Sequence, residues 1–529
     1  MADRQAAPAL GAPSLAALQD LTVCGLLEQR AREMPCRIAL SAQSVRGHRD
    51  RLGYAQLALY MRRVGAGLLQ LGVRPGDRVA VYLGNEAGRE AVLTALGCLA
   101  IGAVAVPVNT RAADAELRHA LALVRPALAV TVAASAARLR AAHAVPLALL
   151  DAAAEAAAAR AWPEPTASTL QCGPCTASTM EPACLLYTSG TTARAKAVVH
   201  THRSMLHAGL AMGLAVGIGP DDLYQGAFPF FTSSCLNLAC MSCWVHGGGF
   251  VLEGPLDNAG RLRLAESECT TIYHGVPSVV QFMLDEAERG GYELRRVRRI
   301  AYGGAAMPAA TVLRIAERWP WMEQVHVWGM TESGPAGAWL APAWLPAKAG
   351  SMGCAMPHCE LGVVDEQGRP VAPGQAGELR FRGPSMAAGY FEDEAATAQV
   401  FRGGWLYTGD IVREDADGLL HFIDRSKDVI NRGGMKIASA AVESALLTVP
   451  GVVEAAVVAA PHRRLGEQVA AFVVAAPGVR LEPAALAQGC RLRLADYEVP
   501  THWEFIDALP KSPMGKVLKR ELRDRLARA

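Results

Sequence analysis

Apolar and amphipathic segments alternate over the first part of the chain. The runs Val79–Asn85 and Ala103–Asn109 are short and apolar and end at polar or turn residues, which is typical of buried strands. Segments 86–99 and 114–123 instead repeat apolar residues with the spacing of a helix. Because strands that alternate with helices form parallel sheets, this region predicts a doubly wound α/β layer. Residues 15–70 are expected to form helices around a short loop.

The hydrophobic pattern changes twice further along the chain. From residue 350 to 423, short strands alternate with glycine and proline turns, which predicts an antiparallel or barrel-like β piece. Before this piece, strands separated by helices are expected near residues 249–252, 271–274, 299–302 and 323–328.

A basic turn with glycines after Asp424 leads into a compact mixture of helices and strands. Helices are expected at 441–447 and 483–494, with apolar strands between them. We therefore predict an α/β fold with a large N-terminal domain at 1–424 and a small α+β C-terminal domain at 425–529.

Composition narrows the class of protein. The 529 residues carry 52 basic and 50 acidic side chains, a net charge of +2, which argues against a nucleic-acid-binding protein. Hydrophobic residues make up 51%, so a mostly disordered chain is excluded. No segment reaches the ~18 uninterrupted apolar residues of a membrane span. The N-terminal segment has an early acid and no apolar core, so no secretory signal is expected and a cytoplasmic location is the default.

Thirteen cysteines give two pairs with the spacing of redox or metal motifs. Cys172 and Cys175 have the thioredoxin-type spacing, but they lie in a linker rich in proline, serine and threonine at 163–181. We interpret that pair as a coincidence of loop sequence. Cys240 and Cys243 lie in an apolar run and are interpreted as core residues, since no histidine pair nearby completes a zinc site.

A run of small hydroxyl residues, a glycine and a lysine gives the clearest chemical signal. Such a turn offers backbone N–H groups, hydroxyls and an ammonium to phosphate oxygens. It does not have the spacing of a Walker loop, and taken alone it is compatible with an ordinary loop. Its residues are Thr188, Ser189, Gly190, Thr191, Thr192 and Lys196.

This run resembles the phosphate loop of the adenylate-forming superfamily, which includes acyl-CoA synthetases, the adenylation domains of peptide synthetases and luciferases. Further motifs of that superfamily follow in order over about residues 20–520. They are Tyr302-Gly303-Gly304-Ala305, Trp328-Gly329-Met330-Thr331-Glu332, Gly377-Glu378-Leu379 with Gly383 and Gly389-Tyr390, Tyr407-Thr408-Gly409-Asp410, Asp424-Arg425-Ser426-Lys427-Asp428 with Gly433-Gly434, and Pro510-Lys511-Ser512-Pro513-Met514-Gly515-Lys516.

The resemblance implies a magnesium site. In the superfamily, a glutamate that matches Glu332 and a phosphate-loop threonine hold the ion, and Thr331 precedes the glutamate. Thr191 or Thr192 matches the threonine, and we take Thr191 as the metal ligand. A hard cation needs such oxygen ligands. Without the other motifs, a Thr-Glu pair is equally typical of a helix N-terminus.

The resemblance also implies an ATP site. Trp328 and Gly329 match the motif whose aromatic ring stacks on adenine, and residues 303–305 match the loop on the adenine side. Asp410 matches the carboxylate that accepts both ribose hydroxyls, and Arg425 would contact the ribose or a phosphate.

Two lysines are assigned catalytic roles by the resemblance. Lys516 would neutralise the charge that develops between the carboxylate and the α-phosphate. Lys427 lies where the superfamily pivots a mobile C-terminal domain between its two half-reactions. Gly433 and Gly434 would then border the tunnel for the thiol, since glycine lets backbone approach a ligand closely.

Several positions depart from the pattern. The superfamily's second glycine, proline and last glycine of the phosphate loop are Ala193, Ala195 and Ala197, and alanine disfavours positive φ angles. Thr232 replaces a histidine that often gates the carboxylate site. It also replaces the aspartate that grips the ammonium of amino acids, so amino-acid substrates are not expected.

The leading hypothesis is an ATP-dependent, AMP-forming acid–CoA ligase acting on a hydrophobic carboxylic acid. Two alternatives keep the fold: a CoA ligase with weakened adenylation that uses a supplied acyl-adenylate, and a ligase that loads an acyl carrier protein. No feature favours a luciferase-like oxygenase. A non-enzymatic binding protein is disfavoured by Glu332, Asp410, Arg425 and Lys516. The acid is expected to contact residues 230–235, 302–307 and 327–335.

Overall fold

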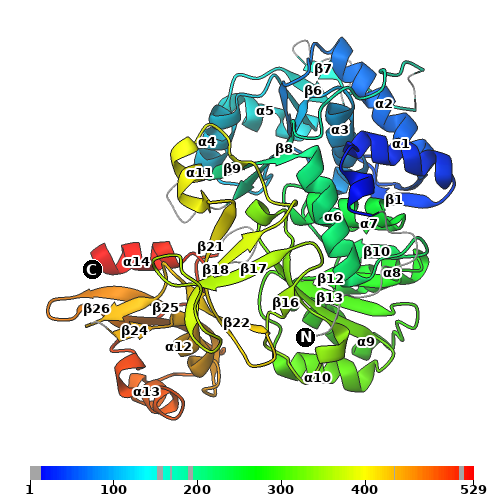
Figure 1. The fold of residues 1–529 in the computed structure, drawn as a ribbon. Coiled ribbons are helices and arrows are strands. Elements are labelled where there is room, and N and C mark those ends of the chain that lie inside the picture. Colours follow the sequence, from blue (N-terminus) through cyan, green and yellow to red (C-terminus); the bar gives the residue numbers. More distant parts are fainter. Residues whose placement is uncertain are drawn as a thin grey trace. The chain divides into compact units, whose positions relative to one another are not determined.

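The computed structural model describes residues 14–151, 159–166, 169–188, 195–433, 435–511 and 517–528. The chain forms two compact units (Figure 1). Unit 1 comprises Met1–Leu361 and Phe381–Leu406, and unit 2 comprises Gly362–Arg380 and Tyr407–Ala529.

An eight-stranded sheet in unit 1 has helices on both faces (Figure 1). Alternate residues of one strand enter two different cores, because successive side chains point to opposite faces. Val79 and Val81 pack with α2 (Tyr54–Gln70) and α3 (Gly88–Ala100), whereas Ala80 packs with α4 (Asp114–Val124) and α5 (Ala133–Ala142). The doubly wound layer is thereby confirmed. In sheet order, the strands are β19 (Gly389–Tyr390), β9 (Lys196–Thr201), β8 (Pro182–Thr188), β4 (Val104–Pro107), β3 (Arg78–Val81), β5 (Leu128–Thr131), β6 (Leu147–Leu149) and β7 (Ala159–Ala161).

A nine-stranded sheet forms the second layer of unit 1. Ile300 of β13 packs with α9 (Pro277–Gly290) and α10 (Ala309–Arg318), and the next residue, Ala301, packs with α6 (His202–Val216) and α7 (Met241–His246) on the other face. The four strands expected between residues 249 and 328 are all present. In sheet order, the strands are β16 (Cys354–Ala355), β15 (Gly337–Leu340), β14 (Glu323–Gly329), β13 (Arg299–Gly303), β12 (Ile272–Gly275), β10 (Leu223–Gly226), β11 (Gly249–Leu252), β1 (Ile38–Gln43) and β2 (Arg49–Gly53).

The prediction for residues 15–70 is wrong in its middle part. Helices α1 (Val23–Glu33) and α2 are present, but the segment between them forms the antiparallel pair β1 and β2. Strand β1 also pairs in parallel with β11, so that Leu40 lies opposite Phe250. A partner some two hundred residues away therefore fixes this segment as a strand, and the local pattern does not reveal it.

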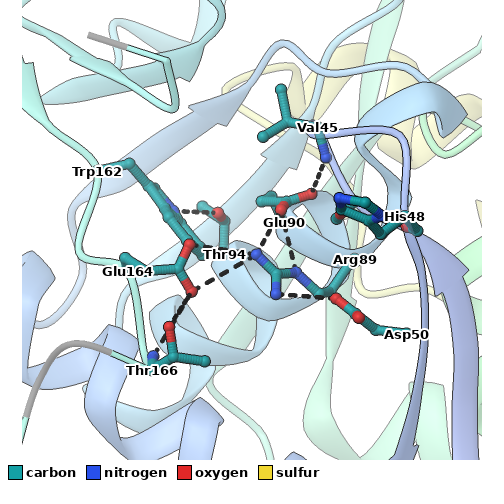
Figure 2. A network of polar contacts seen from close by, with 10 residues as sticks. Val45, His48, Asp50, Arg89, Glu90, Thr94, Trp162, Glu164 and Thr166 are labelled. Carbon is teal, nitrogen blue, oxygen red and sulfur yellow. Dashed lines mark hydrogen bonds and ion pairs between the residues drawn. The ribbon is translucent and has the colours of Figure 1, made fainter. Parts of the chain in front are cut away.

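A buried polar network ties the linker before β8 to helix α3 (Figure 2). The guanidinium of Arg89 pairs with Glu90 at 2.7 Å, with Asp50 at 2.9 Å and with Glu164 of the linker at 3.2 Å. Glu90 is fully buried, and the paired guanidinium offsets the cost of burying its carboxylate. The network thus holds one end of the segment that leads to the phosphate loop.

Unit 2 contains a five-stranded sheet with helices on both faces. Val457 of β25 packs with α12 (Ser439–Leu446) and α13 (Pro483–Arg491), and its neighbour Val458 packs in the core that includes Leu522 of α14 (Lys519–Arg528). The predicted helices at 441–447 and 483–494 correspond to α12 and α13. The strands are β24 (Met435–Ile437), β23 (Ile430–Arg432), β26 (Gly466–Ala475), β25 (Val452–His462) and β27 (His502–Phe505).

The region 350–423 forms short strands, as its glycine and proline turns predict. Helix α11 (Glu394–Val400) interrupts them. In the part of the chain that the structure describes, no helix is both long and apolar enough to cross a membrane. Besides β16 and β19, the strands are β17 (Glu360–Val364), β18 (Ala376–Arg382), β20 (Phe401–Arg402), β21 (Trp405–Glu414) and β22 (Leu420–Arg425), the last pairing antiparallel with β21.

Candidate active site

The motifs of unit 1 meet at the carboxyl ends of β13 and β14. These strands are parallel, with Gly303 opposite Val327, so residues 303–305 and Trp328 lie at the same edge of the sheet. Glycine is required there: a Cβ on Gly303 would lie 2.4 Å from the carbonyl oxygen of Val327, and Gly304 has a φ of +81°. Open sheets bind ligands at this edge. The predicted adenine loop and aromatic motif are therefore neighbours.

Glu332 lies in the turn that follows β14. Its side chain is nearly buried, and Oε1 accepts a hydrogen bond from the hydroxyl of Tyr390 at 2.9 Å. Its carbonyl oxygen accepts a hydrogen bond from the backbone N–H of Ala387, also at 2.9 Å. Burial, and then the charge of Glu332, raise the pKa of Tyr390, so the phenol stays a donor. The carboxylate is thus held in one orientation by the strand that carries Tyr390.

Thr331 is fixed from two sides. Its hydroxyl lies 3.2 Å from that of Ser233, and its carbonyl oxygen accepts a hydrogen bond from Nε2 of His200 at 2.9 Å. Burial lowers the pKa of His200 to about 4, so this imidazole is neutral and carries its proton on Nε2. Ser233 lies in the segment 230–235 that was expected near the acid, but it was given no role of its own, and His200 was not singled out in the sequence.

The phosphate-loop hairpin meets Glu332 through Tyr390. Thr188 and Lys196 are paired at the base of the hairpin formed by β8 and β9. Tyr390 pairs with Val198 of β9, and Nζ of Lys196 lies 4.7 Å from the centroid of its ring. One tyrosine therefore contacts both the lysine and the carboxylate. Ser189, Gly190, Thr191, Thr192, Ala193 and Arg194 lie outside the described residues.

Tyr390 is a site residue that the sequence reasoning missed. Its motif, Gly389-Tyr390, was part of the resemblance, but no role followed from it. The only signal was the motif itself, because the hydrogen-bond partner lies 58 residues earlier in the chain.

Two residues that are predicted to contact the ribose of ATP lie together in unit 2. Asp410 of β21 pairs with Arg425 of β22, with Oδ1 of the aspartate 2.6 Å from Nε of the arginine. Asp410 is almost fully buried. The neighbouring Thr408 donates a hydrogen bond to the carbonyl oxygen of Leu379 at 2.7 Å, which joins this motif to the preceding one.

The hinge motif is bound to the C-terminal helix within unit 2. Asp424 accepts a hydrogen bond from the hydroxyl of Ser439 at 2.8 Å, and Lys519 of α14 donates to the same hydroxyl at 2.6 Å. Asp428 pairs with Arg523, which also donates to the carbonyl oxygen of Lys427. Gly433 has a φ of +60°, whereas Gly434 and Lys516 lie outside the described residues.

Comparison with known proteins identifies the family. Residues 27–391 match the AMP-binding enzyme family, and residues 441–516 match the AMP-binding enzyme C-terminal domain. A feruloyl-CoA synthase of Amycolatopsis sp is 36% identical over 92% of this chain and 97% of the relative. A 2-succinylbenzoate–CoA ligase of Geobacillus kaustophilus is 33% identical over 95% and 98%. The structure of an o-succinylbenzoate CoA synthetase from Bacillus subtilis, in complex with its acyl-adenylate intermediate, superposes with a TM-score of 0.82 at 28% identity, covering 94% and 98%.

The chain therefore belongs to the AMP-binding enzyme family, within the adenylate-forming superfamily. Its substrates include ATP and CoA. Within the superfamily, the chain is an AMP-forming acid–CoA ligase, which joins a carboxylic acid to CoA through an acyl-adenylate.

Proposed function

We propose that the acid is uncharged apart from its carboxylate and is aromatic, alicyclic or medium-chain aliphatic. The observation that carries this proposal is the apolar, neutral character of the residues expected near the acid. Phe230, Phe231 and Met307 are buried. His326 stacks on Tyr302 with ring centroids 5.6 Å apart, and burial lowers the pKa of this histidine. The segments 230–235, 302–307 and 327–335 contain no lysine or arginine that could bind a second carboxylate.

Neutral hydrogen bonds hold residues 228–232 in place. Asn85 donates to the carbonyl oxygen of Phe228 and accepts from the backbone N–H of Phe230, each at 2.9 Å. The hydroxyl of Thr232 donates to the carbonyl oxygen of Pro229 at 2.7 Å, so it is engaged within its own turn. This supports the exclusion of amino acids, whose ammonium would need an acceptor. Two of the relatives are named for feruloyl-CoA and indoleacetate, which agrees with an aromatic acid.

We assign the magnesium ion to Glu332 and Thr191, with Thr331 beside the glutamate. The residues fit a hard cation, because Oε2 of Glu332 accepts no hydrogen bond from any residue that the structure describes. When bound, magnesium would screen the negative charge of the phosphates.

In the first half-reaction, a carboxylate oxygen of the acid attacks the α-phosphorus of ATP, and pyrophosphate leaves. Lys196 and the hydroxyls of Thr188, Ser189 and Thr192 bind phosphate oxygens in this assignment, with the backbone N–H of Gly190. Lys516 stabilises the charge that develops at the reacting centre. Asp410 and Arg425 hold the ribose, and Trp328 stacks on adenine.

In the second half-reaction, the CoA thiol displaces AMP from the acyl-adenylate. We propose that residues 425–529 act as a domain that turns at Lys427 relative to residues 1–424. Gly433 and Gly434 then border the path of the thiol, where a side chain would obstruct it.

The alternative with weakened adenylation loses one of its arguments. Ala197 lies in β9, paired with Tyr187, so its backbone is extended and has no need of glycine. The argument that alanine in the phosphate loop weakens adenylation now rests on Ala193. We favour the ordinary two-step ligase.

An acyl carrier protein is the second candidate for the acceptor. The observation in its favour is a relative from Streptomyces coeruleorubidus, a fatty acid–[acyl-carrier-protein] ligase that is 33% identical over 90% of this chain.

A panel of carboxylic acids tests these proposals. AMP release is measured for each acid with ATP and magnesium, with and without CoA, and then with a carrier protein in place of CoA. We expect CoA-dependent AMP release with an aromatic or other hydrophobic acid. Turnover of only dicarboxylic or amino acids would contradict the assigned acid class, and turnover with the carrier protein alone would replace CoA as acceptor.

A further inference from the structure

His274 is a buried polar residue of unit 1 that the proposed mechanism does not use. It lies on β12, one residue before the end of the strand, and it is 3% exposed. In the parallel sheet it pairs with Gly226 of β10 and with Ala301 of β13. These two strands lead into the segments 230–235 and 302–307, which are expected near the acid. Strand β12 thus places His274 between both segments, at the edge where open sheets bind ligands.

The imidazole of His274 lies on the face of the sheet that α6 and α7 cover. Its ring is edge-on to the ring of Phe228, with centroids 5.0 Å apart, and to the ring of Tyr224, at 5.8 Å. Both aromatic residues belong to the core that includes Phe230, whereas Tyr273, the preceding residue of β12, packs in the core on the other face. His274 therefore shares its face of the sheet with Phe230, a residue of the expected acid site.

The hydroxyl of Tyr224 fixes which nitrogen of His274 carries the proton. Nδ1 of His274 is hydrogen bonded to this hydroxyl, which has no second hydrogen-bond partner among the residues that the structure describes. Tyr224 is fully buried, and a buried O–H without an acceptor is costly, so the phenol donates and Nδ1 accepts. Burial, and then His326, lower the pKa of His274 to about 3, and burial raises the pKa of Tyr224. Both groups are therefore neutral, and the imidazole proton is on Nε2.

Nε2 of His274 is a buried donor that still needs an acceptor. It makes no hydrogen bond to any residue in the described part of the chain. Donors at this depth are normally paired, because an unpaired N–H loses its hydration and gains nothing in return. A ligand bound at this edge of the sheet can supply the acceptor.

We propose that His274 is a specificity-determining residue of the acid site, whose Nε2–H donates a hydrogen bond to a neutral oxygen on the body of the acid. This inference rests on the proposed function and narrows it. The preferred substrate is a hydrophobic acid that bears a hydroxyl, methoxyl or keto oxygen away from its carboxylate. A second carboxylate is not favoured, since a neutral imidazole offers one hydrogen bond and no charge. An acid without the oxygen leaves a buried N–H unpaired, and sites of this kind discriminate against such analogues.

The test compares acids that differ by one oxygen. Initial rates of AMP release with ATP, magnesium and CoA give kcat/KM for benzoic, cinnamic and cyclohexanecarboxylic acid. The same values are measured for their derivatives with one hydroxyl, methoxyl or keto oxygen. We expect the native enzyme to prefer at least one oxygen-bearing acid over its parent by at least ~10-fold in kcat/KM.

Variants of His274 and Tyr224 then show whether the preference comes from Nε2. His274→Leu removes the donor, and the preference should disappear; His274→Gln supplies an amide N–H and should keep part of it. In Tyr224→Phe, Nδ1 can carry the proton and Nε2 can accept. The preference for a methoxy acid, which only accepts, should then fall more than the preference for a hydroxy acid, which can also donate. Tyr273→Phe, at the adjacent buried tyrosine on the other face of β12, is the matched control and should keep the native preference.

The outcomes separate this inference from the proposed function. Equal kcat/KM for every acid and its oxygen-bearing derivative overturns the inference and leaves the ligase assignment intact. A His274→Leu variant that loses activity equally for both acids also overturns it, because that result assigns His274 to the fold or to the carboxylate. Turnover of dicarboxylic or amino acids alone contradicts the proposed acid class as well. If His274→Leu does not fold, an unchanged preference in Tyr224→Phe overturns the inference.

Discussion

At the scale of single residues, Tyr390 connects the parts of the proposed ATP site in unit 1. Its hydroxyl donates to Glu332 at 2.9 Å, and its ring lies under the ammonium of Lys196. Both partners are assigned to phosphate or to its counter-ion. The tyrosine thus orients a carboxylate and restrains a lysine.

We predict that Tyr390→Phe weakens adenylation. The ring remains, but the carboxylate of Glu332 loses a hydrogen bond. A hydrogen bond to a charged group is typically worth about 2 kcal/mol. We expect part of this free energy to appear as a roughly tenfold decrease in kcat/KM for ATP. ATP–pyrophosphate exchange measures the effect, and CoA transfer from synthetic acyl-AMP should hardly change. Tyr292→Phe, on a tyrosine of the core packed by α9, is the control. Equal exchange by Tyr390→Phe and the native enzyme would show that the hydroxyl has no role.

A second prediction concerns the alanines of the phosphate loop. Ala197→Gly should not increase pyrophosphate exchange, because residue 197 is buried and extended in β9. It should lower the free energy of unfolding by about 1 kcal/mol, as expected for glycine inside a strand. Chemical denaturation measures that change. Ala193→Gly is the matched variant in the same loop: a rise in exchange for it alone would favour the weakened-adenylation hypothesis. A rise for Ala197→Gly would contradict our interpretation.

At the scale of elements, the sequence pattern was sufficient where the determinants are local. The apolar run over Val79–Asn85 corresponds to β3, and the segment 86–99 with helical spacing corresponds to α3. The pattern failed where the partner is distant. Strand β1 is fixed by its pairing with β11, which lies some two hundred residues later in the chain.

The candidate site divides in the same way. The motif residues Glu332, Thr331 and Lys196 could be located from their neighbours in the sequence, because the resemblance supplied their roles. Ser233 lies in a segment expected near the acid but had no assigned role, and His200 belongs to no motif, so only the fold shows that both contact Thr331. Side-chain contacts between elements depend on packing, which a one-dimensional pattern does not encode.

Within unit 2, helix α14 is joined to the hinge motif through Arg523 and Asp428, and this leads to a prediction. Arg523→Gln breaks the ion pair with Asp428 and the contact with the carbonyl oxygen of Lys427. Because α14 begins three residues after Lys516, we expect overall turnover to fall roughly tenfold, the scale of a lost charged hydrogen bond. Steady-state CoA ligation measures it. The swap Asp428→Arg/Arg523→Asp should recover part of the loss, and Arg525→Gln, whose partner is Glu504 on β27, should have little effect. No recovery in the swap would refute a direct pairing.

At the scale of the whole molecule, the proposed mechanism requires the chain to complete two different reactions in turn. Lys516 is assigned to the first, so Lys516→Ala should slow acyl-adenylate formation by at least ~100-fold, the usual effect of losing a charge partner in the transition state. Thioester formation from synthetic acyl-AMP should persist. Lys511→Ala, which removes a nearby lysine paired with Glu454, is the control. If both half-reactions fall equally, Lys516 has another role.

A substitution at the hinge is predicted to have the opposite effect on the two half-reactions from Lys516→Ala. Lys427→Pro fixes φ at the residue where we place the pivot, so rotation of residues 425–529 is restricted. Adenylation, which needs one orientation, should persist, whereas CoA transfer, which needs the other, should collapse. Pyrophosphate exchange and CoA transfer from supplied acyl-AMP are measured separately on the same preparation. Lys427→Ala removes the same side chain but leaves φ free, and it should retain most of both activities. Unchanged overall turnover in Lys427→Pro would exclude residue 427 as the pivot. Loss of both half-reactions in the alanine variant would instead assign the ammonium itself to catalysis.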